Sequence, residues 1–176
     1  RYDGRDNATL TGNDNDNRIT GGRGNDTIDG GDGSDTLVGG LGNDTYIYRT
    51  GDTIVEKANE GIDTVQSSST VDLSSFTNIE NITLTGSSNI NATGTSGNNT
   101  ITGNSGNNEL TGGGGNDTLI GGEGDDVYIY TGSEKITEKS GEGDDTIQTS
   151  ISNFNLAEFN TIENLTYTGS LNSILV

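Results

Sequence analysis

The chain repeats its pattern every nine residues, and this period constrains its fold more than any other feature. From Gly21 onward it reads GGRGNDTID, GGDGSDTLV and GGLGNDTYI without a gap. The same period extends back through GNDNDNRIT (12–20) and, more loosely, through DGRDNATLT (3–11). A second block at 94–129 reads GTSGNNTIT, GNSGNNELT, GGGGNDTLI and GGEGDDVYI. A short fixed period is typical of solenoids, in which each repeat stacks on its neighbours.

Each nonapeptide divides into a six-residue turn and a three-residue strand. Glycine at positions one, two and four permits the positive φ angles of tight turns. The triplets TID, TLV, TIT and TLI place one apolar side chain between polar neighbours, so one residue per strand faces inward. We therefore predict an all-β parallel β-roll, a right-handed β-helix-like solenoid with two nonapeptides per coil in two tandem blocks. Its inward positions are Leu10, Ile19, Ile28, Leu37, Tyr46, Ile101, Leu110, Leu119 and Tyr128.

A longer duplication includes the segments that follow each block. Residues 46–66 align without a gap to residues 128–148, at an offset of 82. After one extra residue, 78–87 matches 161–170. We therefore expect two domains, 1–93 and 94–176, each a block plus a strand-rich connector that forms its own roll. Connector strands from Thr53 to Glu56 and from Asp63 to Gln66 should continue the stack, and outward threonines (Thr11 with Thr20, Thr102 with Thr111) should form ladders.

Composition narrows the means by which such a chain can be stabilised. Only 26% of residues are hydrophobic and the net charge is −19, near the range of disordered chains. A flexible acidic linker is the competing interpretation, but a linker does not need apolar and acidic residues at a period of nine. The chain has no Cys and no His, which excludes disulfides and Cys/His zinc sites. The negative charge argues against nucleic acid or an anionic membrane as partner, and no stretch is apolar enough to span a bilayer.

The sixth position of each repeat predicts a cation site. Stacking two repeats per coil brings Asp26 next to Asp44, one coil further on, and carboxylates this close repel each other strongly. Ca²⁺ between the turns would neutralise them, since it takes many oxygen ligands from carboxylates and backbone carbonyls in flexible geometry. Mg²⁺ fits less well because it needs a smaller octahedron and keeps its waters.

The segments GGRGND, GGDGSD, GGLGND, GGGGND and GGEGDD resemble the repeats-in-toxin (RTX) calcium-binding nonapeptide, GGxGxDxUx with U a large apolar residue. The resemblance implies several Ca²⁺ ions, and the duplication of the block leads us to expect them in two groups. In that family, one Ca²⁺ ion is held by positions two, four and six of one repeat together with positions one, three and six of the repeat two further on. Carried over, the predicted ligand sets are Gly22, Gly24 and Asp26 with Gly39, Leu41 and Asp44; Gly30, Asp32 and Asp35 with Asn13, Asn15 and Asn17; Thr95, Gly97 and Asn99 with Gly112, Gly114 and Asp117; and Asn104, Gly106 and Asn108 with Gly121, Glu123 and Asp126.

Other ligand candidates come from the remaining turn positions and from the connectors. Backbone carbonyls are offered by Gly21, Arg23, Gly31, Gly33, Gly40, Gly42, Gly113, Gly115, Gly122 and Gly124. Connector carboxylates that could partner the last Asp residues are Asp52, Glu56, Asp63, Glu138 and Asp145. Asn17, Asn99 and Asn108 supply an oxygen without charge, so sites at the start of each block should be weaker, and Ala8 supplies no side-chain ligand.

The resulting expectation is a non-catalytic calcium-binding module of a secreted bacterial protein. RTX proteins are typically exported unfolded by a type I secretion machine. The resemblance therefore implies that this module would fold outside the cell, when it binds calcium. We expect a monomer, and we expect it to be part of a longer chain. Residues 173–176 resemble the apolar ends of such secreted proteins.

Two other classes of function stay open. The first is binding of a glycan, ice or a cell surface, as part of an adhesin or a polysaccharide-modifying enzyme, through the threonines and tyrosines. The second is enzymatic: without His or Cys only two-carboxylate glycosidase chemistry remains, with Glu56 and Glu138 as candidates. Metal ligation or surface charge explains those two residues more simply.

Overall fold

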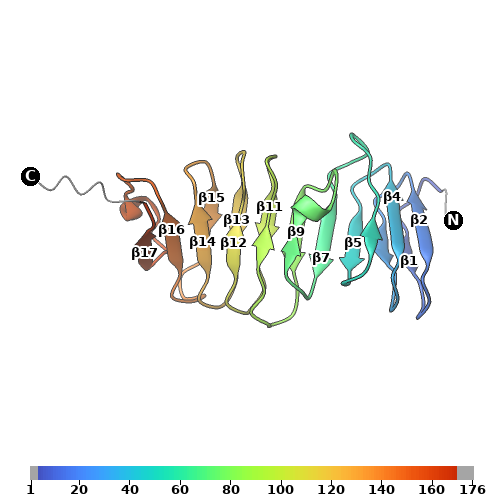
Figure 1. Cartoon of the computed structure of the whole chain (residues 1–176), viewed down its shortest axis with the longest axis horizontal. Coiled ribbons are helices and arrows are strands. Elements are labelled where there is room, and N and C mark those ends of the chain that lie inside the picture. The colour runs from blue at the N-terminus through green and yellow to red at the C-terminus, as the bar shows by residue number, and fades with distance from the viewer. Residues whose placement is uncertain (1–3, 170–176) are drawn as a thin grey trace, which may run out of the picture.

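The computed structural model describes residues 4–169 and shows an elongated roll of parallel strands stacked along its long axis (Figure 1). All fourteen strand pairings within this range are parallel. Only two short 3-10 segments interrupt the described strands, η1 (Leu73–Ser75) and η2 (Leu156–Glu158). The all-β, parallel β-roll prediction is therefore confirmed. Residues 173–176 lie outside the described residues.

One side of the roll is a continuous sheet of eight strands. Its strands pair in the order β1, β3, β5, β7, β9, β11, β13 and β15. Their bounds are β1 (Thr9–Thr11), β3 (Thr27–Asp29), β5 (Thr45–Tyr48), β7 (Thr64–Ser67), β9 (Asn81–Leu84), β11 (Thr100–Thr102), β13 (Thr118–Ile120) and β15 (Lys135–Thr137).

Two smaller sheets make up the other side. The first has three strands, β2 (Arg18–Gly22), β4 (Thr36–Gly40) and β6 (Thr53–Ile54). The second has six, β8 (Val71–Asp72), β10 (Ala92–Thr93), β12 (Glu109–Thr111), β14 (Val127–Tyr130), β16 (Thr146–Thr149) and β17 (Asn164–Tyr167). Along the chain, strands of the eight-stranded sheet alternate with these up to β16, so each coil contributes one strand to each side.

The inward positions form a single file of apolar side chains. Ile28, Leu37 and Tyr46 in the first block are fully buried, as are Leu119 and Tyr128 in the second. Within the blocks, the register pairs each residue with the one two nonapeptides further on, for example Ile28 with Tyr46, as two nonapeptides per coil require. Among the nine inward positions predicted for the two blocks, Leu10 and Ile19, near the first coil, are partly exposed. The prediction that Tyr46 and Tyr128 face inward with the other apolar residues is therefore confirmed.

The connectors continue the stack. Strands β6 and β7 extend the two sides, and their Ile54 and Val65 occupy the inward file. The eight-stranded sheet runs across residue 93 without a break, because β9 pairs with β11. The first connector is thus paired with both blocks. Whether 1–93 and 94–176 fold independently stays a prediction.

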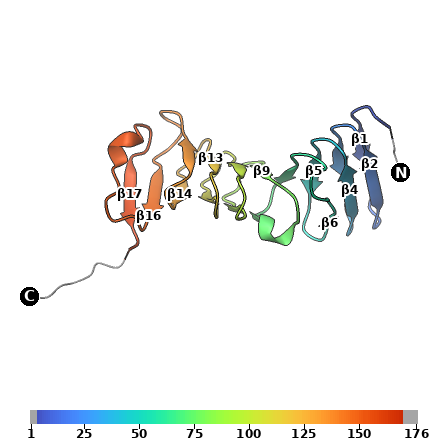
Figure 2. The same ribbon diagram turned by 90° about the horizontal axis from the view of Figure 1, so that it is seen from above.

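The two copies of the duplication are related by half a coil. Strand β5 belongs to the eight-stranded sheet, whereas its counterpart in the second copy, β14, belongs to the six-stranded sheet. Strands β7 and β16 differ in the same way. Figure 2 accordingly shows η1 and η2 projecting on opposite sides of the roll. Features of the first copy therefore recur in the second rotated to the other face.

The expected threonine ladders are wrong in their register. Thr11 lies in β1 and Thr20 in β2, on opposite sides of the roll, and Thr102 and Thr111 are separated in the same way. One nonapeptide is half a coil, so neighbours in a ladder are two nonapeptides apart. The ladder that forms on the eight-stranded sheet joins Thr9, Thr27, Thr45 and Thr64.

Candidate metal centre

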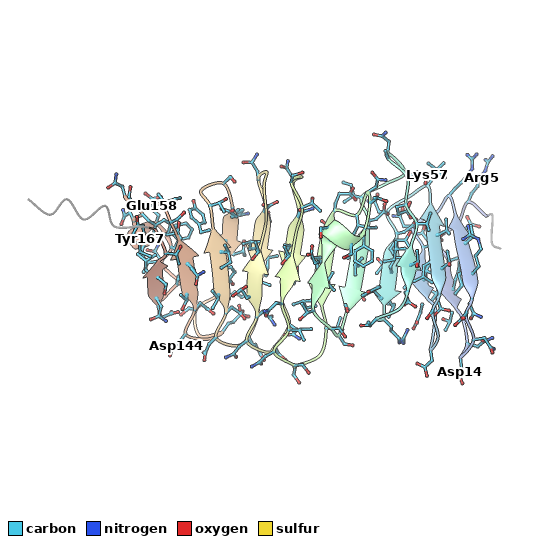
Figure 3. The ribbon with its side chains drawn as sticks, in the orientation of Figure 1. Arg5, Asp14, Lys57, Asp144, Glu158 and Tyr167 are labelled. Atoms are coloured by element: carbon cyan, nitrogen blue, oxygen red, sulfur yellow. The ribbon has the colours of Figure 1, made fainter. Side chains whose placement is uncertain are left out.

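The turns line up along the two edges of the roll. We call the edge where the chain enters the eight-stranded sheet the entry edge; it holds turns 21–26, 39–44, 94–99 and 112–117. The exit edge, where the chain leaves that sheet, holds turns 12–17, 30–35, 103–108 and 121–126. In Figure 3, Lys57 marks the entry edge and Asp144 the exit edge, on opposite sides of the strands.

Glycine is required in these turns for two separate reasons. In turns 30–35, 39–44, 112–117 and 121–126, the second and fourth positions are glycines with positive φ, as at Gly40 (106°) and Gly42 (123°), a region that residues with a Cβ rarely enter. At the first position, glycine is required because there is no room for a Cβ. A Cβ on Gly21 would collide with Oδ2 of Asp26 and the carbonyl oxygen of Gly39 in the next coil. The first glycine therefore keeps open a small space lined by oxygen atoms.

The sixth-position residues form hydrogen-bonded ladders along both edges. On the entry edge, the backbone N–H of Asp26 donates to Oδ1 of Asp44 at 2.7 Å. On the exit edge, the N–H of Asn108 donates to Oδ1 of Asp126 at 2.7 Å. The other two predicted pairs, Asn17 with Asp35 and Asn99 with Asp117, are joined in the same way, each at 2.8 Å. The structure thus stacks the turns of all four predicted ligand sets, while their calcium assignment stays a prediction.

These ladders use only one oxygen of each carboxylate. Among residues 4–169, seven buried carboxylate oxygens have no hydrogen-bond partner: Oδ2 of Asp26, Asp35, Asp44, Asp63, Asp117 and Asp126, and Oε2 of Glu56. A buried polar group left unpaired costs roughly 1–3 kcal/mol, and more when charged. Seven of them approach the whole stability of a typical domain, about 5–15 kcal/mol. These seven oxygens are therefore available to bind a cation.

Inside the blocks, the open spaces beside Gly12, Gly21, Gly94 and Gly103 each have one side-chain oxygen and one backbone carbonyl. At Gly94 it is lined by Oδ1 of Asn99 and the carbonyl of Gly112. At Gly103 it is lined by Oδ1 of Asn108 and the carbonyl of Gly121. Oxygen donors of this mixed kind, with low formal charge, are typical of Ca²⁺ sites.

The end of the first block differs, because carboxylates from the connector replace the carbonyl. Asp44, Glu56 and Asp63 each offer an oxygen within 4.8 Å of the others, and all three are buried. The N–H of Asp44 donates to Oδ1 of Asp63 at 2.7 Å. Glu56 accepts from the N–H of Gly39 at 3.1 Å and from the hydroxyl of Tyr46.

The end of the second block repeats this cluster on the other edge. Asp126, Glu138 and Asp145 bring three carboxylate oxygens within 4.8 Å of one another. The N–H of Asp126 donates to Asp145 at 2.9 Å, and the Tyr128 hydroxyl donates to Glu138. Because the copies differ by half a coil, the first cluster lies on the entry edge and the second on the exit edge.

Burial raises the pKa of several of these carboxyl groups. Burial, aided by the negative charge of Asp63, raises the pKa of Asp44 to about 7. Burial likewise raises the pKa of Asp126 and of Glu138 to about 7, and that of Asp63 to about 6. Neighbouring carboxylates add to each of these shifts. The charged form of each cluster is therefore disfavoured in the absence of a positive ion.

The connector candidates separate into two groups. Glu56, Asp63, Glu138 and Asp145 join the block-end clusters. Asp52 lies on the exit edge instead, where its Oδ1 accepts from the N–H of Asp35 (3.1 Å) and its Oδ2 from the N–H of Arg49 (2.9 Å). Both oxygens of Asp52 are thus engaged by the backbone.

Among the other predicted positions, Asp32, Leu41 and Glu123 are exposed. Arg23 is exposed as well.

Sequence reasoning missed two further acidic residues on these ladders. Glu80 accepts from the N–H of Asp63 at 2.8 Å, and Glu163 accepts from the N–H of Asp145 at 2.9 Å. The matched segments NIEN and TIEN of the duplication carried the signal, since each places a Glu just before a connector strand.

A second ladder, formed by Asn and Asp side chains, was missed as well. Fifth-position residues link neighbouring turns on the outside of the roll, as where the N–H of Asn43 donates to Oδ1 of Asn25 at 2.9 Å. It supports the turns independently of any ion.

The fold and its edges define a β-roll whose stacked turns present oxygen ligands to hard cations. Residues 11–46 and 93–128 each match the family model described as RTX calcium-binding nonapeptide repeat (4 copies). These two segments of the chain are thus RTX-type repeats, and the resemblance found in the sequence is confirmed. No curated protein matches the chain. Within residues 4–169, no helix has the length and apolarity needed to cross a membrane.

Proposed function

We propose that this segment is a calcium-binding, non-catalytic module that folds when it binds Ca²⁺. The observation that carries the proposal is the set of buried carboxylate oxygens without partners along both edges of the described roll. The ions fall into two groups, one per block, with ligands from the stacked turns. RTX repeats bind calcium and are structural rather than catalytic units, which supports the same conclusion.

The proposal extends to where folding takes place. RTX repeat proteins are typically secreted, and Ca²⁺ is scarce in the cytosol but of order a millimolar outside the cell. With a net charge of −19, the chain repels itself until cations bind. It would therefore stay unfolded during export and fold outside, as a monomer within a longer secreted protein.

Equilibrium dialysis against Ca²⁺, with Mg²⁺ as competitor, tests the binding proposal. We expect several Ca²⁺ ions bound per chain at about 1 mM free Ca²⁺, with little loss when the same concentration of Mg²⁺ is added. Absence of bound Ca²⁺ at that concentration would refute the proposal.

A hollow beside η1 favours a second candidate, recognition of a glycan. Tyr48, Thr70, Val71, Asp72, Ser75 and Phe76 line a space of about 200 Å³. Tyr48 and Phe76 meet edge to face, with ring centroids 5.1 Å apart. Aromatic rings beside hydroxyl and carboxylate groups are suited to a sugar ring. A glycan array probed with the calcium-loaded protein and with Phe76→Ala tests this: a hit lost in the variant supports it, and no hit excludes it.

A further inference from the structure

We propose that each connector builds a three-carboxylate cation site at the end of its block, chemically distinct from the sites inside the blocks, which fills first and fastens the connector to the block. The first site consists of Asp44, Glu56 and Asp63, and the second of Asp126, Glu138 and Asp145. This inference rests on the proposed calcium-dependent function.

The position of Glu56 shows how the connector creates the first site. Strand β6 pairs with β4 in a register that sets Thr53 beside Thr36. This spacing is one residue shorter than two nonapeptides. As a result, Glu56 lies one coil after Gly39 and accepts a hydrogen bond from its N–H. Inside a block, the space beside a first-position glycine is bordered by the carbonyl oxygen of the first-position glycine one coil further on. The carbonyl of Gly39, for example, lies beside Gly21. Glu56 thus replaces a neutral backbone ligand with a charged one.

The three carboxylates are poised for a ligand. Asp44 and Asp63 are each 1% exposed and Glu56 is 5% exposed, and each retains one buried oxygen without a partner. Three like charges in a buried space repel one another strongly unless a cation lies between them. The space above Gly39 is bordered by Asp44, Glu56 and the Tyr46 hydroxyl, so a Cβ there would fill it. Glycine is thus needed at this position to keep room for an ion.

The second site reproduces this geometry independently. The space above Gly121 is bordered by Oδ2 of Asp126, the Tyr128 hydroxyl and Oε2 of Glu138. Asp126 is fully buried and its Oδ2 has no partner. The connector ligands of both sites lie outside residues 11–46 and 93–128, the segments matched by the RTX repeat.

The ligand type fits a hard cation of the Ca²⁺ class, with only oxygen donors and three formal negative charges. More charged ligands give tighter Ca²⁺ binding. Inside the blocks, the turns that begin with Gly94 and Gly103 contribute amides, Asn99 and Asn108. The block-end sites therefore bind more tightly and load first. Since their ligands come from block and connector together, loading joins the two.

Two sets of variants of the full chain test this inference. The first is Glu56→Gln with Glu138→Gln, which keeps the shape and removes one charge per site. Its matched control is Glu109→Gln with Glu158→Gln, which removes the same charge from exposed positions that belong to no predicted site. By isothermal titration with Ca²⁺ we expect the first pair to weaken the tightest two ions at least about tenfold, and the control pair to change them less than about twofold.

Tyrosine-sensitised Tb³⁺ luminescence gives a readout that does not depend on how well the first variants fold. The chain has no Trp and six Tyr, and Tyr46 and Tyr128 touch the two sites. The variant Tyr46→Phe with Tyr128→Phe should strongly reduce emission from the first two equivalents of Tb³⁺, whereas Tyr167→Phe should not. Unchanged early emission, or an unchanged tight Ca²⁺ phase in the glutamine pair, would overturn the inference while leaving calcium binding intact. Absence of any Ca²⁺ binding by the wild type would instead remove the proposed function.

Discussion

Asp44 donates its backbone N–H to the carboxylate of Asp63, one coil further on, at 2.7 Å. Its own carboxylate accepts from Asp26 through one oxygen and leaves the other buried without a partner. Each sixth-position carboxylate thus has two roles, since one oxygen fixes the register of the previous turn while the other is free for a cation. Metal binding and strand register are coupled through the same side chain.

Charged ladder residues should matter more for calcium affinity than neutral ones. Asp44→Ala and Asp126→Ala remove a carboxylate that borders two turns, whereas Asn17→Ala and Asn99→Ala remove only an amide near a block start. We expect the Asp variants to cost at least about tenfold more affinity than the Asn variants. Isothermal titration of the four proteins measures this, and equal losses would mean that the ligand assignment is wrong.

The first glycine of the last turn should tolerate no side chain. In Gly121→Ala the new Cβ would collide with Asp126, Tyr128 and Glu138, so we expect a loss of roughly 1–3 kcal/mol in calcium-loaded stability. Gly114→Ala is the control within the same block, since the nearest atom lies 3.5 Å from its Cβ and its φ is not positive. Urea unfolding in Ca²⁺ compares them, and similar midpoints for the two variants would contradict the proposed packing.

Without calcium, the roll should be more stable in acid. The folded-state pKa values of Asp44, Asp126 and Glu138 are raised to about 7 by burial, above their unfolded values of roughly 4. Groups with a raised folded pKa stabilise the fold below the unfolded pKa, and this contribution is lost as pH rises through about 7. Circular dichroism in EDTA should therefore show more β signal at about pH 5 than at about pH 8.

The variant Asp44→Asn with Asp126→Asn is the control for this pH effect. It removes two of the titrating groups while keeping an oxygen at each position. We expect its pH dependence to be flatter than that of the wild type. A dependence of the same size would assign the effect to overall charge rather than to the clusters.

Much of this architecture could be predicted from the period of nine. That period set the inward file, including Tyr46 and Tyr128, because each three-residue strand has a single apolar position. The side of the roll on which a feature lies could not be predicted as easily. Thr11 and Thr20 share a repeat position yet lie on opposite sheets, since a nonapeptide is half a coil.

The connectors were harder to assign because their spacings depart from two nonapeptides per coil. Glu56 contacts Gly39, and the two are one residue closer in sequence than two nonapeptides. Asp63 contacts Asp44, and these two are one residue further apart than two nonapeptides. Acidic composition alone could not distinguish them from Asp52, whose two oxygens are both bonded to backbone N–H groups. The short paired strands of the connector decide which carboxylates reach a cluster.

The first copy should fold without the second. A fragment of residues 1–93 contains five complete nonapeptides or their variants, a connector and one whole block-end cluster. Because neighbouring coils contact mainly each other, stability in such rolls is roughly a sum of local terms. Circular dichroism of the fragment in saturating Ca²⁺ should show β structure. A fragment that stays unfolded while the whole chain folds would mean that pairing of β9 with β11 makes the two copies one interdependent core.

The coupling of calcium binding to folding is tested most directly by circular dichroism of the whole chain during a Ca²⁺ titration from EDTA. We expect a largely unfolded spectrum at neutral pH without calcium, because seven buried carboxylate oxygens of the described roll then lack any partner. Cooperative gain of β signal should follow, complete by ~10 mM Ca²⁺, well above the weak extracellular range. The same β spectrum in EDTA and in ~10 mM Ca²⁺ would contradict the account, since the roll would then form without the ions that its edges require.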